Sequence, residues 1–126
     1  MKTKMTVRKA GFTLVEIMIV VAIIGLLAAI AIPNFVKARA TSQANACINN
    51  MRQIDAAVQQ FALEHGQTTG ATVNFPTDLT PYIKLNANTS VPGCPAGGSY
   101  TVGTIGALPQ VQCSLGNTVT PPHVQP

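Results

Sequence analysis

Hydrophobic residues follow one another almost without interruption near the beginning of the chain. From Phe12 to Ile32, every position is apolar except Thr13 and Glu16. As an α-helix this stretch would be about 31 Å long, which is enough to cross the hydrocarbon core of a bilayer. The pattern therefore predicts a membrane-spanning helix over residues 12–33 that carries a carboxylate close to its beginning.

After Pro33 the apolar residues become periodic. They recur at alternating spacings of four and three along one face, at Cys47, Met51, Ile54, Val58 and Phe61. This spacing is typical of an amphipathic helix with one packing face, which we expect over residues 34–66, with Gly66 at its C-terminal end. The two segments together would form one helix from about residue 12 to residue 65, roughly 80 Å long. Such a length suits a membrane span joined to a soluble half, or a filament.

The C-terminal half, residues 67–126, shows neither pattern and is rich in turn-forming residues. Two short stretches, 100–105 and 110–113, have strand-like composition and flank a turn-forming segment, which predicts an antiparallel hairpin. The proline-rich tail, 117–126, is expected to be mobile. Because about sixty residues bury little core by themselves, this region should pack on the amphipathic helix. The predicted fold class is α+β: a long N-terminal α-helix, made of a membrane span and an amphipathic half, with a small C-terminal antiparallel β-sheet domain.

The positive net charge of +4 is confined to the beginning of the chain. Lys2, Lys4, Arg8 and Lys9 all precede Gly11, and the remainder has as many acidic as basic residues. The basic excess therefore describes a leader and not a binding face, and no nucleic-acid partner is evident. A cationic segment next to an apolar span predicts that the leader stays cytoplasmic and the remainder faces outward.

Glu16 is the unusual residue of the apolar segment. An ionisable group within a membrane span costs a few kcal/mol unless it finds a partner, so it marks a functional site by default. The alternative is an interfacial glutamate whose side chain reaches the aqueous boundary. A secretory signal cut after Ala29-Ile30-Ala31 is a further interpretation, but the apolar run is long for one and Glu16 interrupts it. A plain single-pass anchor would leave Glu16 unexplained.

The sequence Gly11-Phe12-Thr13-Leu14-Val15-Glu16, preceded by basic residues and followed by the apolar run, resembles the N-terminus of type IV pilins and type II secretion pseudopilins. The resemblance implies that a prepilin peptidase removes residues 1–11 by cutting between Gly11 and Phe12 and N-methylates Phe12. It also implies that Glu16 is an assembly residue, paired with the new N-terminal amine of a neighbouring subunit. Gly25 and Pro33 match a glycine and a proline at which such helices kink or melt; an ordinary proline kink is the alternative.

The function implied by this resemblance is that of a structural subunit of a type IV pilus-like filament. Its partners would be identical or related pilin subunits, the prepilin peptidase and an inner-membrane assembly platform. The subunit would cross the bacterial inner membrane once, with its N-terminus cytoplasmic, and then enter a periplasmic or cell-surface filament.

Two other functions are compatible with the sequence. One is the major pseudopilin of a type II secretion system. Those proteins typically bind calcium in a C-terminal loop, and this chain has no Asp or Glu after Asp78 to serve as a ligand. The other is a single-pass membrane-anchored binding module that never polymerises.

The cysteines favour a disulfide in an exported domain of this size. We predict a disulfide between Cys94 and Cys113. Closing this loop would stabilise the folded domain by roughly 3 kcal/mol in the chain-entropy model. Pairing with Cys47 is the alternative, because spacing does not determine connectivity. Cys47 can also be a buried free thiol on the apolar stripe. The close ligand spacing of common zinc motifs is absent, so no metal site is expected.

Catalytic motifs are absent as well. The chain has no nucleophile elbow, P-loop or dinucleotide fingerprint, and its two histidines, His65 and His123, stand at the helix end and in the tail. We therefore expect neither enzymatic activity nor a cofactor. Asn88-Thr89-Ser90 is a glycosylation sequon, a pattern that also arises by chance.

Overall fold

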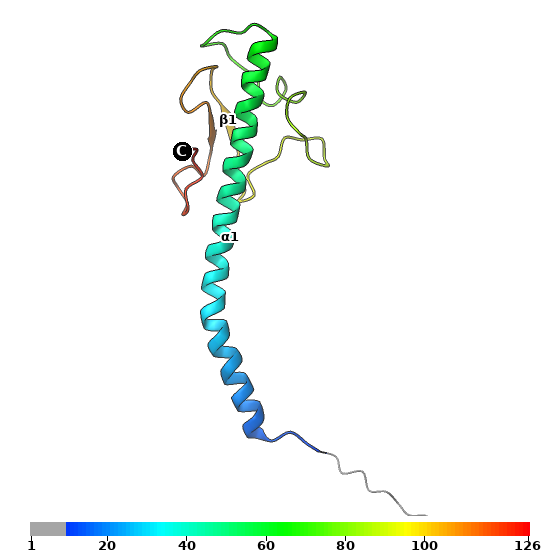
Figure 1. Cartoon of the computed structure of the whole chain (residues 1–126), viewed down its shortest axis with the longest axis vertical. Helices are drawn as coiled ribbons and strands as arrows, with labels where there is room; N and C mark the ends of the chain where they lie inside the picture. Colours follow the sequence, from blue (N-terminus) through cyan, green and yellow to red (C-terminus); the bar gives the residue numbers. More distant parts are fainter. Residues whose placement is uncertain (1–9) are drawn as a thin grey trace, which may run out of the picture. The chain divides into compact units, whose positions relative to one another are not determined.

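A computed structural model describes residues 10–126 and has the expected α+β fold (Figure 1). It contains one helix, α1 (Leu14–Glu64), followed by two short strands, β1 (Tyr100–Val102) and β2 (Val111–Cys113). The basic leader residues lie outside the described residues. The chain divides into two compact units, of which the first ends at Val36 and the second comprises Lys37–Pro126.

The second half of α1, residues 37–64, carries the buried apolar stripe that the periodicity predicts. Cys47, Met51, Ile54 and Val58 are at most 1% exposed, and Phe61 is partly buried against the same core. Leu79, Ile83 and Ile105 supply apolar side chains to this core from outside the helix. The helix therefore provides one side of the core of the small domain.

The end of α1 is also as expected. Gly66 has a φ of +61°, in the left-handed region that favours glycine, and the N–H of Gln67 donates to the carbonyl of Ala62 at 2.9 Å. This is the hydrogen bond of a Schellman motif, which satisfies one of the free carbonyls at a helix C-terminus.

The predicted hairpin is present, with a shorter first strand. β1 and β2 are antiparallel, with Tyr100 opposite Cys113 and Val102 opposite Val111. β1 ends at Val102 rather than near residue 105, because Ile105 makes its backbone hydrogen bonds elsewhere: its N–H donates to Ala71 at 2.9 Å, and its carbonyl accepts from Gly70 at 2.8 Å. A loop distant in sequence thus takes the place of a longer hairpin.

The tail, residues 117–126, contributes one buried polar side chain to the domain, and its mobility stays a prediction. His123 is only 3% exposed, and its backbone N–H donates to the carbonyl of Gly116 at 2.7 Å. The side chain of His123 therefore lies within the domain although the tail around it is rich in proline. This placement brings His123 to the cysteines.

Candidate functional site

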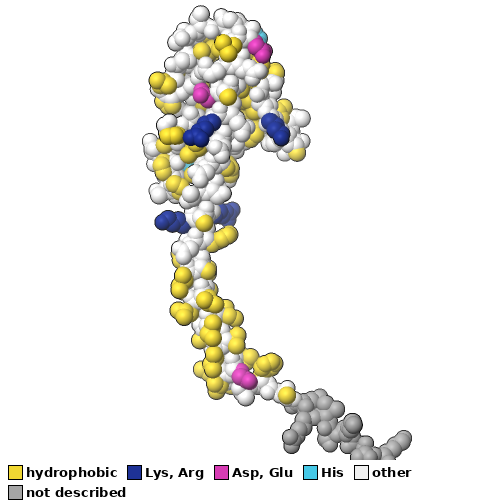
Figure 2. All heavy atoms as spheres, in the orientation of Figure 1, with side chains coloured by type: hydrophobic (Ala, Val, Ile, Leu, Met, Phe, Trp, Pro, Cys, Tyr) yellow, Lys and Arg dark blue, Asp and Glu magenta, His cyan; other side chains and the backbone are white. Residues whose placement is uncertain are grey.

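The first half of α1, residues 14–36, has no packing face against the described residues of its own compact unit. The large apolar side chains from Phe12 to Val36 are between 51% and 86% exposed. Hydrophobic side chains cover this segment in Figure 2. The helix is long and apolar enough to cross a membrane, although a signal sequence would have the same property. Apolar surface of this extent marks a membrane or protein contact rather than an ordinary water-facing surface.

Glu16 takes part in a capping box at the start of this helix. Its Oε2 accepts hydrogen bonds from the backbone N–H of Thr13 at 2.7 Å and from the Thr13 hydroxyl at 2.8 Å. In return, the N–H of Glu16 donates to Thr13 Oγ1 at 3.3 Å. These reciprocal bonds satisfy donors that a helix N-terminus leaves free, and the helix dipole favours the carboxylate there. Thr13 is therefore the N-cap of α1.

The second carboxylate oxygen of Glu16 remains available. Among residues 10–126, both hydrogen bonds to this carboxylate go to Oε2 and none goes to Oε1. Thr13 and Glu16 have the Ser/Thr-x-x-Glu spacing of a capping box, which is the sequence signal for this cap. Glu16 thus has a partner within its own chain and can still accept another.

The proposed cleavage junction lies before the helix. Gly11 and Phe12 are both exposed, Phe12 to 86%, and both precede the first helical residue, Leu14. An exposed, non-helical peptide bond is accessible to a protease. Processing at this bond nevertheless remains a prediction.

Gly25 and Pro33 both lie inside α1. A Cβ added at Gly25 would meet no atom within 4 Å, so packing inside this chain does not require glycine there. Pro33 has no N–H to donate, so the carbonyl of Ala29 loses its helical partner. A kink or melting role for these residues stays a prediction.

The three cysteines are buried free thiols. Cys94 and Cys113, predicted to form a disulfide, lie in one cluster with Cys47 and His123. Burial raises the pKa of the Cys47 thiol to about 12. Burial also opposes ionisation of Cys94, but the N–H groups of Ala96 and Gly98 and the neighbouring thiols outweigh it, so its pKa lies below the ordinary value. The disulfide between Cys94 and Cys113 stays a prediction.

Comparison with known proteins gives a specific match at the N-terminus. Residues 7–32 match the family model described as the prokaryotic N-terminal methylation motif. This range contains the Gly11-Phe12 junction, Glu16 and the whole apolar run from Phe12 to Ile32. No solved structure matches the chain.

Three curated relatives illustrate the wider similarity. The chain is 53% identical over 57 residues to the type IV major pilin protein PilA of Myxococcus xanthus, which covers 45% of this chain and 26% of that protein. It is 35% identical over 86 residues to the type IV major pilin protein PilE1 of Neisseria gonorrhoeae, covering 64% and 52%. It is 48% identical over 54 residues to the type IV major fimbrial protein FimA of Dichelobacter nodosus, covering 43% and 35%.

The similar regions therefore span about a quarter to a half of these relatives. They accompany a methylation motif that occupies the position expected from Gly11, Phe12 and Glu16. By this motif and these similarities, the chain carries a prokaryotic N-terminal methylation motif and resembles type IV pilins over part of its length.

Proposed function

We propose that the chain is a structural subunit of a type IV pilus-like filament. In this proposal it is inserted in the inner membrane, cleaved between Gly11 and Phe12, N-methylated at Phe12 and polymerised through its N-terminal helix. The observation that carries the proposal is the first half of α1, whose large apolar side chains are all at least half exposed. Leaving such a side chain in water instead of burying it costs about 1.5–3 kcal/mol, so the segment requires lipid or neighbouring helices as its surroundings.

Glu16 would determine how those helices align. Cleavage creates an amine on Phe12, which lies four residues before Glu16 and on the same helix face. Oε2 is held by Thr13, whereas Oε1 can accept from the amine of a neighbouring subunit. An ion pair removed from water is favourable only with good geometry, so one axial register between neighbouring helices would be selected. The precursor lacks this amine and would not assemble.

Gly25 and Pro33 would allow this part of the helix to extend within the filament. Glycine costs about 1 kcal/mol relative to alanine in a helix interior, and proline removes a backbone hydrogen bond. The segment between them therefore has less helical stability of its own than the rest of the apolar half. Extension of this segment would not depend on packing at Gly25, because a Cβ there would meet no atom within 4 Å.

The names of the relatives support a filament of related pilin subunits. They are called pilins and fimbrial proteins, which does not favour the secretion pseudopilin. The prepilin peptidase and the inner-membrane assembly platform are further proposed partners. Before assembly the subunit would have its N-terminus in the cytoplasm, and afterwards it would be part of a surface filament. The proposal assigns no catalytic activity to the chain.

Mass spectrometry of sheared cell-surface material tests this proposal. We expect fibres whose subunit begins at Phe12 and carries a methyl group on its N-terminal nitrogen. A chain that begins at Met1 and is found only as a membrane monomer would contradict the proposal and support the non-polymerising anchor. Fibres confined to the periplasm would instead indicate a secretion pseudopilus.

A further inference from the structure

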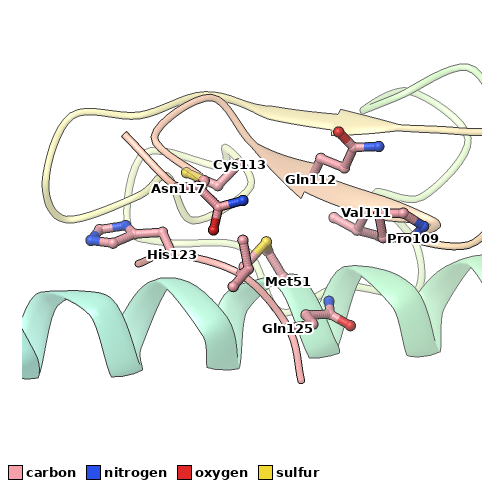
Figure 3. A pocket seen from close by; sticks show the side chains of 10 residues that line it. Met51, Pro109, Val111, Gln112, Cys113, Asn117, His123 and Gln125 are labelled. Atoms are coloured by element: carbon pink, nitrogen blue, oxygen red, sulfur yellow. The ribbon is translucent and has the colours of Figure 1, made fainter. Parts of the chain in front are cut away.

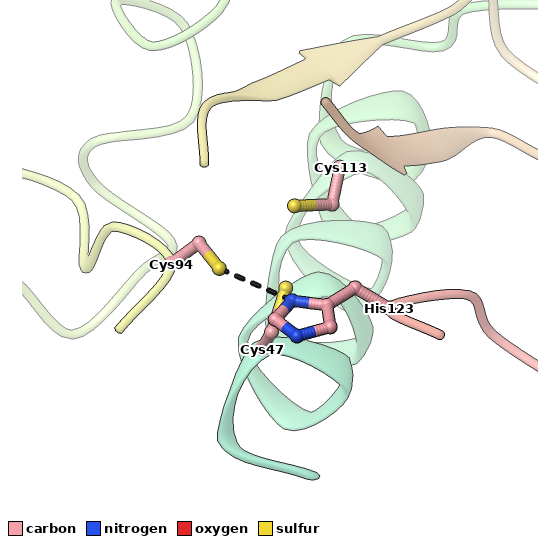
Figure 4. Close-up of side chains that lie close together, drawn as sticks. All are labelled: Cys47, Cys94, Cys113 and His123. Carbon is pink, nitrogen blue, oxygen red and sulfur yellow. Dashed lines mark hydrogen bonds between the residues drawn. The ribbon is translucent and has the colours of Figure 1, made fainter. Parts of the chain in front are cut away.

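Four buried side chains from distant parts of the sequence meet beside the second half of α1. Cys47 lies on the helix, Cys94 in a turn before β1, Cys113 at the end of β2 and His123 in the tail (Figure 4). Their exposed fractions are 0%, 7%, 7% and 3%, respectively. One ligand atom from each, the three sulfurs and a ring nitrogen, lies within 4.8 Å of all the others. Cys94 Sγ is 3.3 Å from His123 Nδ1.

This set of ligands fits a tetrahedral zinc ion. Three cysteines and one histidine are a common ligand set of structural zinc sites, with Zn–S near ~2.3 Å and Zn–N near ~2.0–2.1 Å. These bond lengths place the ligand atoms of a regular tetrahedron roughly 3.5–3.8 Å apart. The observed upper limit of 4.8 Å therefore requires a contraction of only about 1 Å on metal binding.

The turn that carries Cys94 is held in place on both sides of the cysteine. The side chain of Asn50 donates to the carbonyl of Gly93 at 3.1 Å, and that of Gln43 donates to the carbonyl of Pro95 at 3.4 Å. The N–H of Gly97, whose φ is +88°, closes the turn by donating to the carbonyl of Cys94 at 2.9 Å. The backbone N–H groups of Ala96 and Gly98 lie near the Cys94 sulfur and favour its ionised form. Such outer-shell donors orient a thiolate ligand and stabilise its charge.

The remaining ligands are positioned as closely. Gly98 passes so near to Cys113 that a Cβ at residue 98 would lie 2.8 Å from its sulfur. Next to Cys113, Ser114 donates its N–H to the carbonyl of Ser99 at 2.8 Å, which extends the pairing beyond the hairpin strands. The backbone N–H of His123 donates to the carbonyl of Gly116, and this hydrogen bond positions the part of the tail that carries the imidazole. Cys94, Cys113 and His123 thus each lie on a segment held by hydrogen bonds, and Cys47 lies on the helix itself.

A cavity gives access to the cluster. It has a volume of about 310 Å³, and its lining includes Cys113 at the end of β2 and His123 in the tail (Figure 3). Met51, Asn117 and Gln125 form other parts of its wall. A metal ion could reach two of the four ligands through this space without unfolding the domain.

We propose that Cys47, Cys94, Cys113 and His123 form a structural zinc site that fastens the helix, the hairpin and the tail to one another. Zinc would bind thiolates, so up to three thiol protons would pass to solvent and no electron would be transferred. The two strands have only three residues each, so regular structure alone gives this small domain little support. A disulfide between any two of the cysteines would instead leave the third thiol and the His123 imidazole buried without a metal ion to bind.

Metal analysis of the full-length protein, purified in detergent without chelators or added reductant, tests the proposal. We expect one zinc ion per chain and three thiols that react with alkylating reagents only after chelation or denaturation. Cobalt should replace the zinc and give the absorption bands of tetrahedral thiolate coordination. Two results would overturn the proposal. One is metal-free protein that binds neither zinc nor cobalt. The other is a disulfide found by mass spectrometry after denaturation of the zinc-loaded protein.

Variants separate ligation from general packing. His123→Ala should lower zinc affinity by about 100-fold or more, because even the loss of an outer-shell partner costs about 10–100-fold. The matched control His65→Ala removes an exposed histidine outside the cluster and should bind zinc as the wild type does. Unchanged zinc affinity in His123→Ala would contradict the site. If His123→Ala does not fold, the cobalt spectrum and zinc content of the wild type still decide the matter.

Discussion

The two halves of α1 have the same backbone conformation and opposite relations to their surroundings. In the first half, Ile24 is 59% exposed, whereas in the second half Ile54 is 1% exposed against the core of its own chain. A continuous apolar run leaves a helix with no face that its own domain can cover, but a periodic stripe matches one small domain. The exposed first half therefore calls for partners outside the chain, whereas contacts within the chain stabilise the second half.

The largest effect is expected at Glu16, where the partner should come from another subunit. Glu16→Ala should leave membrane insertion intact and reduce the yield of sheared filaments to background, because no carboxylate remains to pair with the Phe12 amine. Thr13→Ala is the matched control: it removes the N-cap and costs about 1 kcal/mol at the helix end, but keeps the carboxylate. Filament loss in both variants to the same degree would show that Glu16 acts through the cap alone.

The same substitution in each half separates internal from external packing. Ile54→Ala should lower the free energy of unfolding of the C-terminal domain by about 2–5 kcal/mol, because it leaves a cavity in the core. Ile24→Ala should leave that free energy unchanged, since Ile24 is 59% exposed in the part of the chain that the structure describes. Denaturant unfolding of both variants in detergent measures the difference. Equal losses would disprove the division of the helix into two kinds of surface.

Gly98→Ala probes the close contact with Cys113. The added Cβ would lie 2.8 Å from the cysteine sulfur, so we expect a loss of about 1–3 kcal/mol in unfolding free energy and weaker zinc binding. Gly93→Ala serves as the control, because a Cβ there would meet no atom within 4 Å. Thermal unfolding with and without a chelator measures both effects. If Gly98→Ala behaves as Gly93→Ala does, the close approach has no energetic weight.

The smallest effect is expected at the end of the helix. Gly66→Ala places a side chain at a φ of +61° and should cost about 1–2 kcal/mol, because a non-glycine residue is strained there. Hydrogen exchange of the last turn of α1 should rise, with no change at β1. A stability loss spread evenly over the domain would be inconsistent with a purely local cap.

Sequence patterns predicted the features that depend on neighbouring residues. The spacing of Cys47, Met51 and Ile54 gave the buried stripe, and Gly66 marked the helix end. The hairpin was predicted too, but the early end of β1 was not, because Ile105 pairs with Ala71, which is distant in sequence. The capping box was not predicted, although the Thr-x-x-Glu spacing of Thr13 and Glu16 is the pattern that could have indicated it.

The cluster of cysteines and His123 could not be predicted in the same way. Its members are far apart in the sequence, and their spacing matches no compact metal motif. The position of His123 depends on a backbone hydrogen bond to Gly116 and on burial by segments that show no periodicity. Only the folded chain brings these ligands together.

The contact between the Phe12 amine and the Glu16 carboxylate is most directly measured in filaments assembled from two differently labelled populations. One population carries nitrogen-15 in phenylalanine and the other carries carbon-13 in the glutamate carboxylate, so that only contacts between subunits give a solid-state NMR signal. We expect dipolar coupling between the two labels, consistent with an ion pair whose nitrogen and oxygen are within about 4 Å. Its absence from mixed filaments, together with its presence in filaments from one doubly labelled population, would contradict pairing between subunits.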